Sequence, residues 1–432
     1  MTSHTVTKRR HNFRIVGAMI AFAACVFNMP FASAQSTPAA KPNEVKEAIR
    51  PEIAKPMIAA EKALQEKKYT EALQQIVEAE KVDGKTPYEI YLLNRMRASA
   101  AIGAGNDALA VKSLEAAMAS GRVLAAEKLN ILDGIARIYY RMKDYKQTAV
   151  WAALALKEPG ARNETRLMLG HAAYINNDFA LAKAEIATYL AAMEQAGTLP
   201  TEDQLRLLAS ASLKSNDTAG YAATLERIVV RFPTKEYWAD LIYRVESKPG
   251  FSDRLVLDVY RLKLLTGAMS EKSDFNEMAS LTLQSGFPAE ASKAIEAGIA
   301  AGALTRDTGV DTEKKLRASI AKELAEENAR AAKPGQAPPK GAIALMNHGY
   351  DAVLKGDAKK GLELMEAGMK AADQKRPEEA KLRYGIALVL AGQKPRAGEV
   401  FKTVMGTEGA ADLARLWELY TRQVEVDAKG KS

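Results

Sequence analysis

The chain has 432 residues, of which 47% are hydrophobic and 26% are charged, and its formal net charge is +8 at pH 7. This length exceeds what one simple hydrophobic core supports, and it suits two or three domains or one long repeat array. The composition is ordinary for a folded protein, which excludes a chain that is disordered throughout.

The first 34 residues have the pattern of an export signal, with a basic start, an apolar run over 15–27 and the small residues Ala32-Ser33-Ala34 that signal peptidase recognises. We expect cleavage before Gln35 and a periplasmic location. Cleavage removes four basic residues and no acidic one, so the formal charge falls from +8 to +4. So small a charge gives no reason to expect nucleic acid or an acidic membrane as a partner. The basic residues are Lys8, Arg9, Arg10 and Arg14.

Cys25 is the only cysteine, and Phe22-Ala23-Ala24-Cys25 resembles a lipoprotein box. Anchoring through an acylated Cys25 is therefore the alternative. Against it, Phe22 stands where leucine is usual, and the residues after Cys25 stay apolar. The apolar run is shorter than the roughly 20 residues that span a bilayer, so we expect no membrane span after signal removal. A chain cut before Gln35 has no cysteine, which excludes disulfides and thiolate chemistry.

From residue 44 onward, one spacing recurs: a small residue, a second small residue 12 positions later, an apolar residue four further and a small or apolar one three further. Consecutive starts lie 38, 38, 34 and, near the C-terminus, 36 residues apart. This spacing predicts stacked pairs of helices, which cross where small side chains let the backbones approach. Turn residues such as Gly105-Asn106-Asp107 and Asn177-Asp178 fall between the two helices. The starts are Ala60, Ala98, Gly170, Ala279, Gly349 and Gly385, with a looser match at Ala136.

Two poorer units fill the gap, one over 201–232 and one that opens at Thr234 with Trp238-x-x-Leu241. The spacing and this motif resemble the tetratricopeptide repeat family over most of residues 44–304 and 341–405. The resemblance implies an all-α, tetratricopeptide-like helix-pair solenoid that binds proteins. We expect no strands.

The regular spacing breaks at residues 305–340, where a charged stretch over 311–332 precedes a Pro-rich segment. We expect a domain boundary there. It would separate a solenoid over 44–304, preceded by a flexible tail over 35–43, from a smaller C-terminal helix-pair domain over 341–432. An insertion in one continuous solenoid is the alternative. Residues 411–423 are expected to form a capping helix.

The sequence carries no recognisable catalytic motif. His171 and His348 are isolated from one another and from any carboxylate pair at helical spacing, so we expect no metal site. Residues 103–108 match a dinucleotide fingerprint, but they follow a helical stretch and coincide with a repeat turn. We therefore expect no enzyme activity, no cofactor and no small-molecule substrate.

The candidate binding residues are those on the first helix of each pair, near the small packing residue, because first helices line the concave face of such solenoids. Arginine and tyrosine there are the types enriched at protein-binding hot spots. The principal candidates are Arg95, Arg137, Tyr140, Arg141, His171 and Tyr174. The same rule adds Ser99, Asp133, Leu167, Met346 and Tyr350.

A narrower resemblance concerns residues 237–241 through 286–291, and residues 382–391 with Leu416-Trp417. These segments are similar to exported repeat proteins associated with TonB-type energy-transduction systems. The resemblance implies a periplasmic scaffold that binds other envelope proteins or peptide segments, in a TonB-type uptake system. The alternative is an accessory subunit of an envelope enzyme system, such as peptidoglycan or polysaccharide assembly, with catalysis in the partner.

Overall fold

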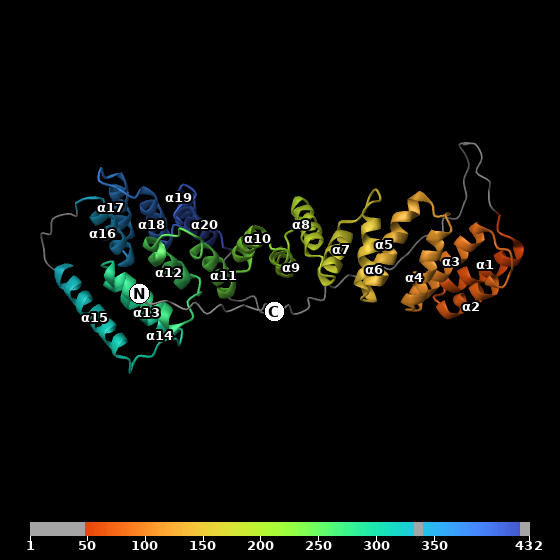
Figure 1. The fold of residues 1–432 in the computed structure, drawn as a ribbon, viewed down its shortest axis with the longest axis horizontal. Coiled ribbons are helices and arrows are strands. Elements are labelled where there is room, and N and C mark those ends of the chain that lie inside the picture. The colour runs from red at the N-terminus through yellow and green to blue at the C-terminus, as the bar shows by residue number, and fades with distance from the viewer. Residues whose placement is uncertain (1–47, 332–339, 424–432) are drawn as a thin grey trace. The chain divides into compact units, whose positions relative to one another are not determined.

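A computed structural model describes residues 48–331 and 340–423 of the chain, and every regular element in these two ranges is a helix (Figure 1). The predicted all-α class is thereby confirmed. The predicted signal, its cleavage site, the tail over 35–43 and most of the Pro-rich segment lie outside the described residues. The chain divides into two compact units between Gln204 and Leu205.

The first unit consists of four helix pairs. Each odd-numbered helix packs on the even-numbered helix that follows it, and each pair packs on the next, so the pairs stack in chain order from orange to yellow in Figure 1. A three-residue turn joins the two helices of every pair. The helices are α1 (Pro51–Gln65), α2 (Tyr69–Glu80), α3 (Pro87–Gly103), α4 (Asp107–Ala119), α5 (Ala125–Arg141), α6 (Tyr145–Ala155), α7 (Asn163–Ile175) and α8 (Phe179–Gln195).

The small residues of the repeat lie where the two helices of a pair cross. A Cβ atom added to Gly170 on α7 would lie 2.6 Å from Ile186 Cγ1 and 3.3 Å from the Ala182 carbonyl oxygen on α8. These are the residues that the spacing pairs with Gly170. The looser match at Ala136 is equally well packed, because Ala136 and its partner Thr148 are both fully buried. The predicted register is confirmed at these crossings.

The turns share a backbone feature as well as a length. Seven positions after the first small residue of each regular pair stands a residue in the left-handed conformation, for example Gly105 with φ of 71° and Lys143 with φ of 61°. The next residue is usually an asparagine or aspartate that caps the second helix, as Asp144 does by accepting a hydrogen bond from the Gln147 amide. The left-handed residues are Lys67, Gly105, Lys143, Asn177, Asn216, Gly286, Gly356 and Gly392.

The second unit contains α10 to α20, and α9 (Glu202–Lys214) spans the division. Helices α10 to α14 pack in chain order, and α15 packs on α13 and α14. The helices are α10 (Thr218–Arg231), α11 (Lys235–Glu246), the 3₁₀ turn η1 (Asp253–Leu255), α12 (Val256–Leu265), α13 (Lys272–Gln284), α14 (Pro288–Ala300), α15 (Asp311–Ala331), α16 (Ala342–Leu354), α17 (Ala358–Lys370), α18 (Pro377–Leu390), α19 (Lys394–Phe401) and α20 (Ala410–Thr421).

The C-terminal helices α16 to α20 belong to the same compact unit as α10 to α15. The boundary expected within 305–340 stays a prediction. Helix α20 covers α18 and α19, as expected of a cap, and it also packs on α10 and α11. The aromatic rings of Trp238 on α11 and Tyr420 on α20 lie 6.4 Å apart. Arg254 bonds both Glu379 and Glu408. These contacts join segments that are more than 100 residues apart in the sequence, so the local repeat spacing could not predict them.

Candidate protein-binding face

The six principal candidates lie on the first helices of three consecutive pairs of the first unit. Arg95 is on α3, His171 and Tyr174 are on α7, and the other three are on α5. None of the six is fully buried. The structure brings two of them, Tyr140 and His171, into direct contact and holds the three arginines in ion pairs.

Arg95 links two pairs. Its guanidinium lies 2.8 Å from the carboxylate of Glu127 on α5, which also accepts a hydrogen bond from the Tyr91 hydroxyl on α3. The same carboxylate bond and burial raise the pKa of the Tyr91 hydroxyl to about 12, with burial the larger cause. Arg95 is therefore part of the contact between the second and third pairs.

Arg137 is paired within its own helix. Its Nε atom lies 2.8 Å from Asp133 Oδ2. Asp133 is only 4% exposed and also accepts a hydrogen bond of 2.6 Å from the Thr165 hydroxyl on α7. Arg141 is bound to Asp107 at the start of α4, with 2.7 Å between Nε and Oδ2. Both arginines are thus neutralised by carboxylates of the chain itself.

Tyr140 and His171 form the centre of an aromatic cluster. The Tyr140 hydroxyl and His171 Nδ1 share a hydrogen bond of 2.9 Å. The ring of Tyr145, the first residue of α6, lies 5.7 Å from the Tyr140 ring and 5.8 Å from the His171 ring, measured between centroids. All three side chains are half-buried. We call Tyr140, Tyr145 and His171 the aromatic platform.

The aromatic platform is uncharged at neutral pH. Burial lowers the pKa of the His171 imidazole below its usual value. Burial, with a smaller effect of Tyr145, raises the pKa of the Tyr140 hydroxyl to about 12. Since both groups stay neutral, the platform offers ring faces and a hydrogen-bonded edge but no charge of its own.

Tyr145 is a member of the platform that sequence reasoning missed, because it begins a second helix and the search covered first helices. The sequence does contain a pattern that indicates it. Three of the four pairs of this unit carry an aromatic residue nine positions after their first small residue, namely Tyr69, Tyr145 and Phe179. Phe179 contacts the last principal candidate, Tyr174, with ring centroids 5.4 Å apart.

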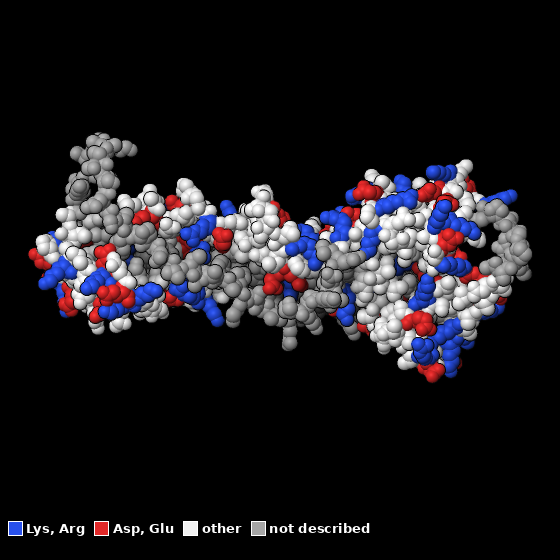
Figure 2. Space-filling view, turned by 180° about the vertical axis from the view of Figure 1, so that it is seen from behind, with Lys and Arg blue, Asp and Glu red and all other residues white. Residues whose placement is uncertain are grey.

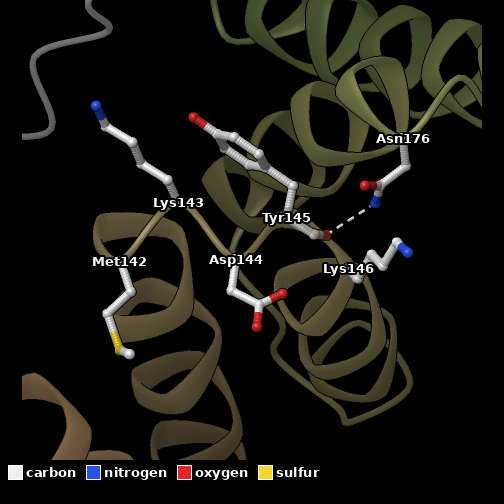
Figure 3. Close-up of a pocket in the computed structure, with 6 residues that line it drawn as sticks. All are labelled: Met142, Lys143, Asp144, Tyr145, Lys146 and Asn176. Carbon is white, nitrogen blue, oxygen red and sulfur yellow. Dashed lines mark hydrogen bonds between the residues drawn. The ribbon is translucent and has the colours of Figure 1, made fainter.

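An open hollow of about 460 Å³ adjoins the platform at the turn between α5 and α6 (Figure 3). Across it, the Asn176 side-chain amide donates a hydrogen bond of 2.9 Å to the Tyr145 carbonyl oxygen and so ties the third pair to the fourth. The lining residues are Met142, Lys143, Asp144, Tyr145, Lys146 and Asn176.

Four of the additional candidates are buried, which corrects the expectation that they face a groove. Asp133 accepts a hydrogen bond from the next pair, Leu167 is buried on α7, and Met346 and Tyr350 are buried in the second unit. These residues were chosen as if the second face of each first helix were open to solvent. In the structure, neighbouring pairs and the C-terminal helices cover part of that face as well. Ser99 is exposed, as expected.

Tyr350 belongs to a buried ionic network that no sequence pattern indicated. Arg261 on α12 is 5% exposed, and its guanidinium donates to Glu290 through Nε at 2.8 Å and Nη2 at 2.7 Å and to Asp258 through Nη1 at 2.7 Å. The Tyr350 ring on α16 lies 4.2 Å from the Arg261 Cζ atom. Arg383 on α18 approaches Asp258 at 3.3 Å. The network joins α12 and α14 to α16 and α18.

Within residues 48–331 and 340–423, no group of three or more His, Cys, Asp or Glu side chains is placed to hold a metal ion. None of the helices in the same ranges is both long enough and apolar enough to cross a membrane. Gly103 ends α3 and Asp107 begins α4, so residues 103–108 form the predicted repeat turn.

No protein-family model matches the chain, and no curated protein matches it. Solved structures similar to it include the C-terminal part of a TPR repeat-containing protein from Cytophaga hutchinsonii, with 14% identity over 74% of this chain and 97% of that chain and a TM-score of 0.29. A tetratricopeptide repeat protein from Parabacteroides merdae has 12% identity over 78% and 99%, with a TM-score of 0.31.

Similarities of this size say nothing about partners. The architecture rests on the chain's own helices, which pair through short turns, cross at small residues and repeat every 34 to 38 residues in the first unit. The chain is an all-α protein of tetratricopeptide-like helix pairs.

Proposed function

We propose that this chain is an exported, non-enzymatic scaffold that binds other proteins of the cell envelope, or segments of them, on its first unit. The observation that carries the proposal is the aromatic platform. Tyr140, Tyr145 and His171 come from two consecutive pairs and are held by ring contacts and a hydrogen bond. Aromatic groups fixed before binding lose little conformational freedom when a partner arrives, and tyrosine is enriched among hot-spot residues.

The shape and charge of the site favour a protein segment. Small-molecule sites usually enclose most of their ligand, whereas the hollow beside the platform is open to the surface. Figure 2 shows one face of the molecule, on which basic and acidic side chains are interspersed. A nucleic-acid site needs a continuous basic surface, which this face does not present.

The envelope location rests on the signal-like first 34 residues. N-terminal sequencing of the exported chain tests it: a start at Gln35 supports a free periplasmic scaffold, and a lipid-modified Cys25 contradicts it. Within the envelope, the segments similar to TonB-associated repeat proteins support a role beside a TonB-type uptake system. Recovery of peptidoglycan or polysaccharide enzymes instead would replace that role by the accessory-subunit alternative.

The test of partner binding is affinity capture from envelope extracts with cross-linking. The wild type should recover specific partners that the double variant Tyr140→Ala/His171→Ala fails to recover. The matched control is Tyr243→Ala, which removes a tyrosine that is 59% exposed in the second unit and should leave recovery unchanged. Circular dichroism and melting confirm folding, and Tyr145→Leu replaces the double variant if that variant unfolds. The proposal fails if the wild type captures no specific partner or the platform variant captures the same partners equally.

A further inference from the structure

The hollow beside the aromatic platform has two lysines on its rim. Figure 3 shows Lys143 and Lys146 on either side of Tyr145, which lines the hollow and is also a member of the platform. The two lysines are exposed. Both lysines line the hollow, and their side chains extend outward from the turn in different directions.

Neither ammonium is engaged within the chain. Across the residues that the structure describes, Lys143 and Lys146 make no hydrogen bond and no ion pair through their side chains. Asp144 is the one carboxylate among the lining residues, and its Oδ1 accepts a hydrogen bond of 3.1 Å from the Gln147 amide. The neighbouring Arg141, by contrast, is bound to Asp107. The lysines are thus the cations of this surface that remain available.

Lys143 occupies a backbone position that does not favour lysine. Its φ is 61°, in the left-handed region, and the same turn position holds glycine or asparagine in six of the eight regular pairs. Glycine and asparagine adopt this conformation at lower cost than lysine does. The lysine therefore does not serve the turn. Lys67 is the other exception, and Lys67 is not among the residues that line the hollow.

From this arrangement we infer that the hollow receives the carboxylates of an acidic segment of a partner protein. An aromatic or apolar side chain of that segment lies on the platform, and the flanking Asp or Glu side chains meet Lys143 and Lys146. The inference rests on the proposed function and names the chemistry of its partner. Charge pairs at such an exposed rim act mainly on association and weaken with salt.

The test uses a fluorescently labelled copolymer of glutamate and tyrosine as the probe and the processed full chain as the receptor. Binding is measured by anisotropy at low and at physiological salt. We expect Lys143→Gly/Lys146→Gln to weaken binding at least about tenfold at low salt, with a smaller salt dependence than the wild type. The matched control, Lys67→Gly, makes the same change in the first pair and should leave the affinity unchanged.

Stability gives a second readout, because a lysine-to-glycine change at a left-handed position should raise the melting temperature at both sites. A variant that is more stable and yet binds less cannot owe its loss to unfolding. The inference is overturned if the probe does not bind, if the double variant binds it normally, or if Lys67→Gly weakens binding equally. It is also overturned if phosphatidylglycerol vesicles, and not the copolymer, bind in dependence on the two lysines.

Comparison with affinity capture separates the two proposals. If Tyr140→Ala/His171→Ala loses the envelope partners while Lys143→Gly/Lys146→Gln retains them at the wild-type yield, the binding function stands and the acidic-segment inference falls. If neither variant loses them, both proposals fall.

Discussion

Arg141 on α5 binds Asp107 on α4, where the third helix pair packs on the second. Where the second pair packs on the first, the equivalent repeat positions hold Gly103 and Tyr69. Tyr69 and Asp107 each stand nine positions after the first small residue of their own pair. Gly103 and Arg141 each stand five positions after the first small residue of the following pair. The Tyr69 ring occupies the space that a Cβ atom on Gly103 would need. The same contact between neighbouring pairs is thus made by a tyrosine ring against a glycine at one boundary and by an arginine–aspartate ion pair at the next.

This equivalence predicts a coupled exchange. Asp107→Tyr and Arg141→Gly should each destabilise the first unit, because the new tyrosine meets a long side chain and the new glycine leaves Asp107 unpaired. The double variant should recreate the contact of Tyr69 with Gly103. In a double-mutant cycle by urea unfolding, we expect a favourable coupling of at least about 0.5 kcal/mol. Additive effects would show that the two boundaries are not equivalent.

Gly170→Leu tests the crossing of α7 and α8. Because a Cβ alone would lie 2.6 Å from Ile186 Cγ1, a leucine overpacks the crossing, and the free energy of unfolding should fall by about 1–3 kcal/mol. Gly309→Leu is the control, since a Cβ there meets no atom within 4 Å. An unchanged melting temperature of Gly170→Leu would contradict the packing described for this pair.

Exchanging lysine and glycine at the left-handed turn position should change the free energy of unfolding in opposite directions at two sites. Lys67→Gly should stabilise the chain by about 1 kcal/mol, because it removes the cost of lysine at φ of 59°. Gly105→Lys places lysine at the equivalent φ of 71° and should destabilise by a similar amount. Thermal unfolding of both variants measures the difference. Equal shifts in the same direction would rule out this explanation.

Glu89 predicts how stability depends on acid. The side-chain hydrogen bond from Arg50 is the largest cause that holds the pKa of Glu89 at about 2, below its usual 4.5, and Glu89 is fully buried. Because the folded-state pKa is depressed, this stabilisation is complete above about pH 4.5 and is lost as the pH falls toward 2. Urea unfolding between pH 6 and 2 should show a shallower acid loss in Glu89→Gln. A wild-type slope in that variant would assign the acid sensitivity to other carboxylates.

The Arg261 network predicts the largest single effect in the second unit. Arg261→Met leaves Asp258 and Glu290 buried without their cation, which typically costs about 3–5 kcal/mol. Because the network joins α12 and α14 to α16 and α18, limited proteolysis should then cut the chain more readily between α15 and α16. Arg306→Met, which changes an exposed arginine, should affect neither measurement. Wild-type stability of Arg261→Met would mean that the network does not hold these helices together.

The helix pairs were predictable because their determinants are local. A small residue such as Gly170 finds Ala182 and Ile186 by spacing alone. The weaker pair over 201–232 follows the same register, with Ala209 buried and Asn216 seven residues on at positive φ. Partners distant in the sequence were not predictable. Nothing around Arg254 indicates that it meets Glu379, 125 residues later.

The candidate face was predicted only in part for a related reason. Periodicity indicates which way a helical side chain points, and two of the candidates it selected, Tyr140 and His171, lie within hydrogen-bond distance in the structure. It does not indicate whether a charge is already matched. Arg137 and Arg141 were chosen as arginines of the kind enriched at protein-binding hot spots, and both are bound to carboxylates. Lys143 and Lys146 lie outside the first helices that supplied the candidates, so these two cations, which have no partner among the described residues, were not considered.

Because α20 packs on α10 and α11, the second unit can complete its folding only later than the first. The first unit is built mainly from contacts between helices that are neighbours in the sequence, so each pair can settle as soon as the next one is available. The second unit has bonds such as Arg415 to Glu226 and Gln423 to Val229, which span 189 and 194 residues. Helices α10 and α11 therefore keep apolar surface uncovered until α20 is available to pack on them.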